Sequence, residues 1–436
     1  MKCLLFAFLA AAALPAAAAD ARLGAPEKKM IQTVERESER TLGLLEKLVN
    51  QNSGTLNLAG VEAVGRMVRP ELESLGFAVR WVPMAEAKRS GHLIATHKGN
   101  GRGKRMLLIG HLDTVFEPES PFQRFSREGD RATGPGIGDD KGGIVVMVAA
   151  LRAMQAAGTL RDADIEIVLT GDEEDAGDPI EIARRDLIEA GRRADIALDF
   201  EGLSQEDGRD MGSIARRSSG SWEVRATGRT GHSSGIFGPT AGNGAIYELT
   251  RIIAAFRSEL PEQNLTFNVG LVAGGTTAAL DEAKIRATAT GKTNIIPEIA
   301  IARGDIRTLS REQNDRVMAK MREIVSRHLP GAGAAISFDP GGYPPMAPTA
   351  GNRALLDRLN AVNRDLGLGE MPVLDPLKRG AGDIGFVAET VDGLVGLGTA
   401  GEKAHAPGEF IYLDSLDRQA KRAAILMTRL SREKRR

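Results

Sequence analysis

Histidine and carboxylate side chains follow several apolar runs of this sequence, at positions where a metal site could form. His111 and Asp113 lie in LLIGHLDTV, directly after the apolar run 106–109. Because residues i and i+2 of a strand point to the same side, the imidazole could bind a metal while the carboxylate orients it. A single hydrogen-bonded histidine at a strand end is the alternative interpretation of this motif.

Two acidic clusters carry further candidate ligands. Asp139 and Asp140 lie in GPGIGDDKGG, before a predicted helix. This stretch lacks the spacing of a phosphate-binding loop, and two aspartates would repel a phosphate, so the alternative is a solvated acidic loop. Glu173 and Glu174 lie in IVLTGDEEDAG, after a predicted buried strand. Clustered like charges are costly unless a cation or water neutralises them, although an exposed turn would also avoid that cost.

The remaining candidates are Asp199 and Glu201 in ADIALDFEG and His405 in GLGTAGEKAHAPGEF. With the clusters above they supply two histidines and several carboxylates, and the chain has no cysteine after Cys3. This donor set suits zinc, cobalt or manganese. It is compatible with a two-metal hydrolytic centre, in which one carboxylate bridges the ions and another takes a proton from the water.

The elements that must position these residues alternate between short apolar runs and helical patterns. The predicted order is helices at 28–49 and 60–75, a strand at 106–109, a helix at 143–155, and strands at 165–170 and 196–198. This alternation predicts an α/β fold with a mostly parallel sheet and helices on both faces. Ligand sites of such sheets lie at the carboxyl ends of strands, where these polar clusters fall.

The pattern changes near residue 213 to one of short strands and two amphipathic helices. The expected elements are a hairpin with strands 213–217 and 221–226, a helix that contains Ile246 and Phe256, strands at 266–272 and 300–307, a helix with a capping box at Ser310, and a strand at 335–338. We therefore expect an inserted α+β domain over residues 213–332. Residues 20–212 and 333–436 would form the two parts of the main domain.

Residues 1–19, MKCLLFAFLAAAALPAAAA, have the three parts of a secretory signal peptide. Lys2 supplies the charged start, residues 4–14 the apolar run, and residues 17–19 a small-residue cleavage site. Cleavage would remove the single cysteine, Cys3, so we expect a secreted or periplasmic chain without disulfides. No later apolar run approaches the ~20 residues of a membrane-spanning helix, so no membrane partner is expected after cleavage.

The composition of the 436-residue chain argues against several classes of function. Its formal net charge is −1, whereas nucleic-acid-binding proteins carry a basic excess. Aromatic residues make up only 4%, which offers no stacking platform for single strands. The motif G-x-S-x-G is absent from a strand–elbow context, which argues against a serine hydrolase.

The motifs HLDTV, GDDKGG, GDEE, FEG and GRTGHSSG, followed by a late histidine, occur in the order and spacing of one family. The chain resembles the di-zinc aminoacylase/carboxypeptidase metallopeptidases. These include acetylornithine deacetylase, succinyl-diaminopimelate desuccinylase and secreted glutamate carboxypeptidases of the carboxypeptidase G type. The signal peptide, LVNQNSGTLNLAGV and DDKGG make it most similar to the last group. The resemblance covers nearly all of the chain after residue 19.

The resemblance implies two Zn²⁺ ions per subunit, with Co²⁺ or Mn²⁺ as alternatives. One ion would be bound by His111, Asp139 and Glu201, and the other by Asp139, Glu174 and His405, so that Asp139 bridges them. The family also implies a cis peptide after this bridging aspartate. Asp199 remains a competing candidate for the position of Glu201.

The resemblance also implies roles for residues that do not bind the ions. Glu173 matches the general base, which deprotonates a water bridging the metals and protonates the leaving amine. Asp113 matches the carboxylate behind His111. The inserted domain resembles a lid that forms a homodimer interface. Its implied site residues are His232, which would reach the partner subunit's active site and polarise the scissile carbonyl, Arg307, which would hold a substrate carboxylate, and Asn243 and Asn294, which would lie near substrate.

The resemblance thus implies a secreted metallopeptidase that hydrolyses an amide bond in a small peptide or an N-acyl amino acid. It would release a C-terminal residue, with glutamate as the first candidate. An N-acyl-amino-acid deacylase or a dipeptidase would use the same scaffold and would differ in which end of the substrate must be charged. A non-catalytic binding scaffold should have lost a ligand or the base, and none is missing here.

Overall fold

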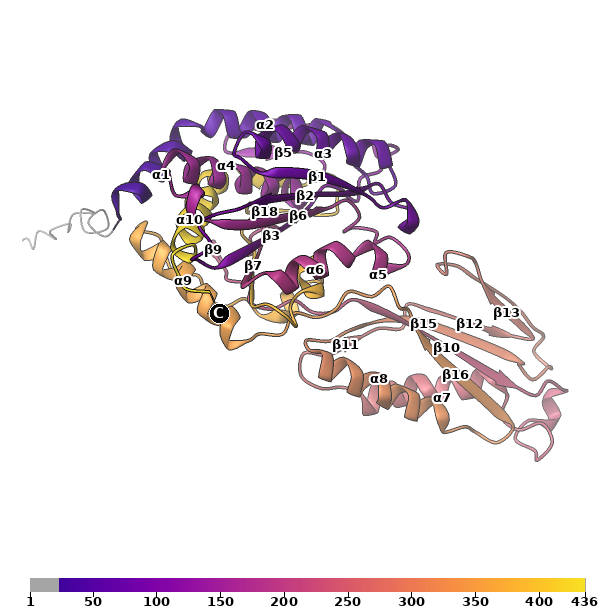
Figure 1. The fold of residues 1–436 in the computed structure, drawn as a ribbon. Coiled ribbons are helices and arrows are strands. Elements are labelled where there is room, and N and C mark those ends of the chain that lie inside the picture. The colour runs from indigo at the N-terminus through magenta and orange to yellow at the C-terminus, as the bar shows by residue number, and fades with distance from the viewer. Residues whose placement is uncertain (1–22, 436) are drawn as a thin grey trace, which may run out of the picture.

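Two separate sheets organise the chain in the computed structural model, which describes residues 23–435 (Figure 1). The predicted signal peptide and Cys3 lie outside the described residues. The first sheet has the order β1 (Ala78–Pro83), β2 (Gly91–His97), β6 (Asp164–Thr170), β3 (Arg105–His111), β7 (Ile196–Asp199) and β17 (Gly393–Val395). The last four strands of this order are parallel to one another, and β1 and β2 form an antiparallel edge. The predicted α/β fold with a mostly parallel sheet is confirmed.

The central strands form because their apolar runs are buried on both faces, as parallel strands require. Leu107, Leu108 and Ile109 of β3 and Ile167 and Val168 of β6 are almost inaccessible to solvent. Their parallel register places His111, the last residue of β3, opposite Thr170, the last residue of β6. The polar clusters that follow these two strands therefore begin side by side.

Helices cover both faces of the first sheet (Figure 1). One face carries α1 (Ala25–Arg36), α2 (Ser38–Asn50), α3 (Leu58–Glu73), α4 (Gly142–Ala156) and α10 (Asp414–Leu430) with α9 (Ala350–Asp365) beside them, and the other carries α5 (Ile180–Ala183) and α6 (Arg185–Arg193). The single helix predicted at 28–49 is wrong, because the helix is interrupted at Glu37. No apolar residue occurs between Val34 and Leu42, so this turn has no apolar side chain that could pack against the core.

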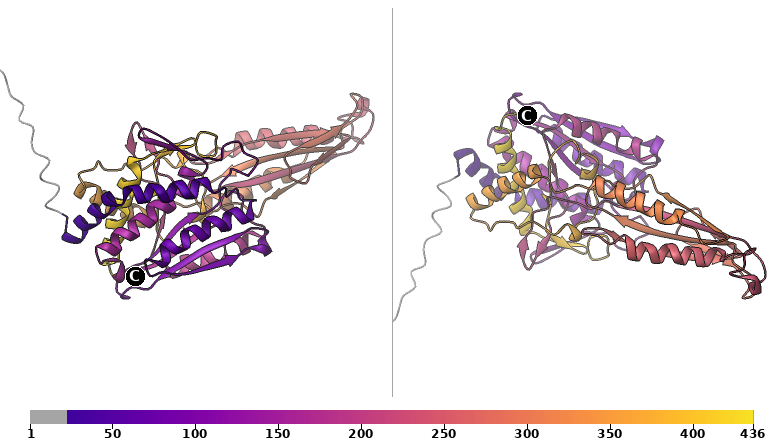
Figure 2. Two further views of the ribbon diagram at one scale, coloured as in Figure 1. Left: turned by 90° about the horizontal axis from the view of Figure 1, so that it is seen from above. Right: turned by 90° about the horizontal axis from the view of Figure 1, so that it is seen from below.

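The second sheet is antiparallel and, with two helices on one face, projects from the first (Figures 1 and 2). Its order is β11 (Thr266–Phe267), β15 (Ile299–Arg307), β10 (Gly220–Gly228) and β16 (Ala332–Phe338), and β12 (Leu271–Gly275) also pairs with β15. Helices α7 (Gly244–Glu259) and α8 (Arg311–Ser326) enclose a core centred on Trp222 and Phe256. We call residues 220–338 the inserted block; its predicted bounds are 213–332.

Two predicted strands of the inserted block differ in the structure. The hairpin at 213–226 is wrong, because only its second strand exists, as β10. Residues before Gly220 pair instead with the returning chain, through the bridges Arg216–Met346 and Ser219–Tyr343. The strand predicted at 266–272 is split into β11 and β12. Phe267 pairs with Ile306 and Leu271 pairs with Arg303, so this segment has one residue more than the facing stretch of β15. Such an extra residue forms a bulge.

Small sheets complete the fold. One has the order β18 (Gly401–Glu402), β19 (Phe410–Tyr412), β5 (Arg131–Thr133) and β4 (Ser126–Glu128), and two hairpins pair β8 (Gln205–Glu206) with β9 (Arg209–Asp210) and β13 (Thr277–Leu280) with β14 (Ala287–Thr290). The β19–β5 pairing brings the late segment around His405 next to the glycine-rich stretch 134–143. Among the described residues, no helix combines the length and apolarity that crossing a bilayer demands.

Candidate metal centre and active site

A cleft of about 940 Å³ lies at the carboxyl ends of the parallel strands. Strand β6 leads into Glu173 and Glu174, β7 leads into Glu201, and all three residues line this cleft. Asp139, from the loop before α4, and His405, from the loop between β18 and β19, line it as well. The position is the one expected for a ligand site of an open α/β sheet.

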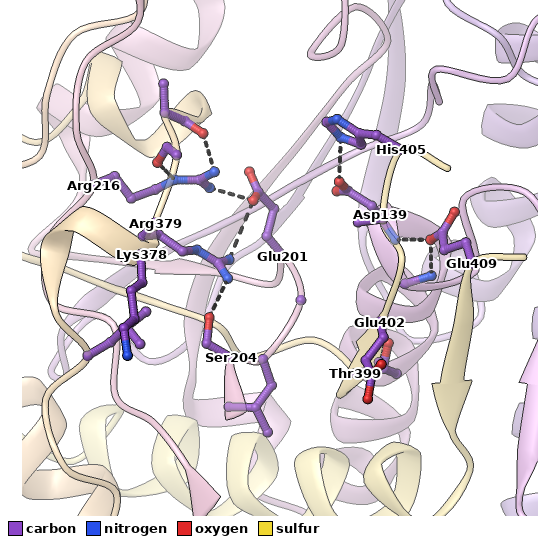
Figure 3. Close-up of a pocket in the computed structure, with 18 of the residues that line it drawn as sticks. Asp139, Glu201, Ser204, Arg216, Lys378, Arg379, Thr399, Glu402, His405 and Glu409 are labelled. Atoms are coloured by element: carbon purple, nitrogen blue, oxygen red, sulfur yellow. Dashed lines mark hydrogen bonds and ion pairs between the residues drawn. The ribbon is translucent and has the colours of Figure 1, made fainter. Parts of the chain in front are cut away.

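Asp139 lies between two histidines. Its Oδ1 is 3.1 Å from His111 Nε2. Its Oδ2 is 2.9 Å from His405 Nε2 (Figure 3). Glu174 Oε2 lies 3.1 Å from the same atom of His405. Ligand atoms of His111, Asp139 and Glu174 all lie within 4.8 Å of one another. A carboxylate that presents one oxygen to each of two histidines is placed to bridge two ions.

The donor chemistry of this cluster fits a divalent cation. Imidazole nitrogen and carboxylate oxygen suit zinc, cobalt and manganese. Within the described part of the chain, Glu174 Oε1 is buried without a hydrogen-bond partner, which a bound ion would supply. His111, Asp139, Glu174 and His405 are therefore the residues that would hold the metal.

The charged groups of the cluster shift one another's pKa values. Hydrogen bonds to Asp139 and Glu174 raise the pKa of His405 to about 11. Burial raises the pKa of Glu174 to about 7. Burial acts against the charged form of Asp139 too, but hydrogen bonds from His111 and His405 outweigh it and hold the pKa of Asp139 below its ordinary value. Since metal ligands must be deprotonated, a divalent ion would compete with the imidazole protons for these carboxylates.

Asp113 connects the strand end of β3 to the segment that follows β6. Its Oδ1 lies 3.4 Å from His111 Nδ1 and accepts the backbone N–H of Glu173 at 3.0 Å. Its Oδ2 accepts the N–H of Glu174 at 3.0 Å and the hydroxyl of Thr55 at 2.6 Å. The fully buried carboxylate thus orients one histidine and fixes the backbone of both glutamates.

The two adjacent aspartates have different environments. The peptide between Asp139 and Asp140 is cis, as predicted. Asp139 lines the cleft, whereas Asp140 is fully buried and accepts the backbone N–H of His111 at 3.3 Å. Burial raises the pKa of Asp140 well above its ordinary value. Asp139 is therefore the one available to a ligand.

Glu409 holds the loop that carries Asp139. Its carboxylate accepts the backbone N–H groups of Gly138 and Asp139 at 2.7 and 3.1 Å (Figure 3). It also accepts the N–H of Gly136 at 2.9 Å. Glu409 is not among the site residues predicted from the sequence. No local signal could reveal it, because the contact depends on the β19–β5 pairing.

Glu173 lines the cleft beside the cluster and is placed to transfer protons. Burial raises its pKa well above the ordinary value, and the negative charge of Glu201 acts in the same direction. Its backbone carbonyl accepts the hydroxyl of Tyr343 at 2.6 Å. A positioned carboxyl of raised pKa suits general acid–base work.

Glu201, the other predicted ligand, lies outside the group of His111, Asp139 and Glu174 and pairs with two arginines, so its role as a ligand stays a prediction. Its Oε2 lies 2.5 Å from Arg216 Nη1 and 3.5 Å from Arg379 Nη2 (Figure 3). Asp199, the competing candidate, accepts the N–H of Glu201 at 3.0 Å, and burial raises its pKa to about 7. Of the two, Glu201 is the one that lines the cleft.

The predicted substrate-binding residues fall in two places. Arg307, at the end of β15, lines the cleft, and its Nε lies 3.2 Å from Asp305 Oδ2. His232, Asn243 and Asn294 belong to the inserted block and do not line it. The His232 ring contacts Ser234 Oγ at 2.8 Å, the Asn243 side chain donates to the Pro330 carbonyl, and the Asn294 carbonyl accepts the N–H of Ser233.

Two arginines that line the cleft were not predicted from the sequence. Arg216 precedes β10, and Arg379 follows the short helix η6 (Pro376–Lys378). In the sequence each belongs to a basic dipeptide, Arg216-Arg217 and Lys378-Arg379. Isolated basic dipeptides are common on surfaces, so the signal was too weak without the fold.

The model of peptidase family M20/M25/M40 matches residues 107–429, a span that includes every residue of the metal cluster. The chain belongs to the M20/M25/M40 peptidase family. It is accordingly a metal-dependent hydrolase of amide bonds. The family resemblance drawn from the sequence motifs is confirmed.

Relatives and solved structures agree with this M20/M25/M40 assignment. Carboxypeptidase G2 of Pseudomonas sp. (strain RS-16) is 29% identical over 91% of both chains. Succinyl-diaminopimelate desuccinylase of Novosphingobium aromaticivorans is 31% identical over 63% of this chain and 71% of its own. Aminopeptidase PepT of Bacillus cereus superposes with a TM-score of 0.70 at 19% identity over 90% and 98% of the two chains. A dinuclear metal-binding M20 peptidase of Bacillus subtilis gives 0.63 at 18% identity over 91% and 99%.

Proposed function

We propose that this M20/M25/M40 hydrolase is a secreted carboxypeptidase that releases a C-terminal glutamate from small peptides or N-acyl glutamates. The observation that carries the proposal is Arg307, which lies in the same cleft as the metal cluster. Its planar guanidinium can bind a free carboxylate through two parallel hydrogen bonds. The similarity to carboxypeptidase G2 over 91% of the chain supports the same reaction.

The residues divide the chemistry among them. Divalent ions, for which we propose zinc, would be held by His111, Asp139, Glu174 and His405, where they polarise a carbonyl and acidify water. Glu173 takes a proton from the attacking water and later delivers it to the leaving amine. Its backbone is kept in place by the buried carboxylate of Asp113.

We also propose that the chain is exported and forms a homodimer. The tripartite residues 1–19 support export, followed by cleavage before Asp20. Exposed Phe237, Tyr247 and Val272 give the inserted block an apolar surface that a second copy could cover. We propose a homodimer through this block, in which His232 of one copy serves the cleft of the other.

A deacylase that removes an acyl group from an amino acid is the second candidate. The 31% identity to succinyl-diaminopimelate desuccinylase favours it. The two candidates differ in the charged end of the substrate that must be recognised. A carboxypeptidase requires the C-terminal carboxylate and tolerates varied acyl groups, whereas a deacylase selects the acyl group.

The test is zinc-dependent release of free glutamate from a panel of N-acyl and dipeptidyl glutamates by residues 20–436. Glu173→Gln should keep its metal and lose turnover by roughly 10²–10⁴-fold, because it cannot accept the proton. Glu189→Gln, on the exposed side of α6, is the matched control. Full activity of Glu173→Gln would refute the assigned base, and no release from the metal-loaded native chain would refute the preference for glutamate.

A further inference from the structure

Arg379 is a cleft residue whose hydrogen-bonding capacity is largely unused. Its side chain is 13% exposed, and Nη1 donates to Ser204 Oγ at 3.0 Å (Figure 3). Among the residues that the structure describes, its buried Nε has no hydrogen-bond partner. A buried N–H without an acceptor is destabilising, so a group that supplies the acceptor would be favoured.

The charge of Arg379 is also poorly compensated. Within the described part of the chain, the one carboxylate in ion-pair range is Glu201, at 3.5 Å. That carboxylate lies closer to Arg216, at 2.5 Å, and two guanidinium groups therefore share it. Burial and the positive charge of Arg216 both lower the pKa of Arg379. An arginine does not lose its proton in proteins, so the unmatched charge attracts an anion.

Arg307 and Arg379 reach this cleft from different parts of the fold. Arg307 ends strand β15 of the inserted block, and Arg379 follows η6 on the first-sheet side. A C-terminal acidic residue carries two carboxylates, one on the backbone and one on the side chain. A neutral C-terminal residue carries only the first.

We propose that Arg379 binds the side-chain carboxylate of a C-terminal acidic residue while Arg307 binds the backbone carboxylate. The inference rests on the proposed carboxypeptidase function and adds the residue that selects glutamate. Ser204 orients the guanidinium, and a planar guanidinium can bind one carboxylate through two parallel hydrogen bonds. Lys378, the preceding residue, is 57% exposed and already paired with Glu206 at 2.7 Å, so it is not part of this subsite.

The test compares N-acetyl-glutamate with the near-isosteric, neutral N-acetyl-glutamine. The native chain should prefer the glutamate substrate, and Arg379→Gln should lower its kcat/KM by at least about 10-fold, chiefly through KM. The glutamine substrate should change by less than about 2-fold. Arg379→Lys should restore part of the preference, since lysine keeps the positive charge but lacks the two parallel N–H donors of the guanidinium. Lys378→Gln is the matched control and should behave as the native chain.

Calorimetric binding of L-glutamate and L-glutamine to the zinc-loaded proteins separates the subsite from the reaction. Preferential binding of L-glutamate that is lost in Arg379→Gln supports the subsite even if no substrate is cleaved, in which case only the proposed reaction fails. Equal binding of both amino acids by the native chain overturns the subsite. An equal loss for both substrates in Arg379→Gln, accompanied by loss of metal, also overturns it and makes Arg379 a positioning residue for Glu201.

Discussion

At the scale of single residues, Asp139 links the two halves of the candidate centre. One of its oxygens contacts the histidine at the end of β3, and the other contacts the histidine of the late loop. Glu409 holds its backbone, and the adjacent Asp140 is directed into the core. The position of this one carboxylate therefore depends on three separate segments of the chain.

Asp139→Asn should remove metal binding while leaving the fold intact. The amide keeps the size of the carboxylate but loses the charge that a bridging ligand needs. We expect the zinc content to fall below one ion per chain and activity to drop by at least about 10²-fold. In the native chain, zinc at 100 times its Kd should add about 2.7 kcal/mol to the free energy of unfolding, and a chelator should remove this gain.

Elemental analysis and thermal unfolding, with and without chelator, test this expectation. Asp175→Asn is the control, because Asp175 belongs to the same acidic stretch but is 59% exposed. Two ions retained by Asp139→Asn, or an equal metal loss in Asp175→Asn, would contradict the assignment.

At the scale of elements, Arg184 ties the segment that carries Glu173 to the connection of the inserted block. This fully buried residue joins α5 to α6. It donates to Asp172 Oδ1 at 2.6 Å, to Asp383 Oδ1 at 2.8 Å and to the Tyr343 hydroxyl at 2.6 Å. Tyr343 in turn donates to the backbone carbonyl of Glu173.

Arg184→Met should destabilise the protein by about 3–5 kcal/mol, because it leaves two buried carboxylates without their counter-charge. Arg185→Met, at the next and exposed position, should change the free energy of unfolding by no more than about 0.5 kcal/mol. Equilibrium unfolding in urea measures both. Equal stability of the two variants would show that the buried network contributes nothing net.

At the scale of the whole molecule, the inserted block places three predicted site residues away from their own cleft. His232, Asn243 and Asn294 make contacts only within that block in the described structure. A second copy of the chain is the simplest way to bring them to a metal cluster. Symmetric dimers make such an exchange reciprocal, so each copy would complete the site of the other.

Mixing two inactive variants tests this exchange. His232→Ala keeps Glu173, and Glu173→Gln keeps His232, so a heterodimer has one complete site. Co-refolded in equal amounts, the pair should regain about a quarter of the native activity, since half the dimers are mixed and each has one of two sites intact. Light scattering should report a dimer. A monomer with full activity, or no recovery on mixing, would refute the shared site.

The sequence alone determined the features that depend on local pattern. Alternating apolar runs and helices predicted the α/β fold, because burial on both faces leaves continuous apolar strands. The order and types of His111, Asp139, Glu174, Glu201 and His405 indicated a metal-ligating set, of which Glu201 pairs with arginines in the structure. The same motifs identified the M20/M25/M40 family and the cis peptide before Asp140.

Only the tertiary structure decided the features that join distant segments. The predicted hairpin failed because Arg216 and Ser219 pair with the returning chain rather than with β10. The contact of Glu409 with the Asp139 loop and the crowding of Arg216 and Arg379 around Glu201 also depend on packing. Local propensity is set by neighbours in the chain, whereas charge compensation is set by neighbours in space. Arg379, which we assign to substrate selection, could therefore be found only in the folded molecule, whereas Arg307 was already predicted from the sequence.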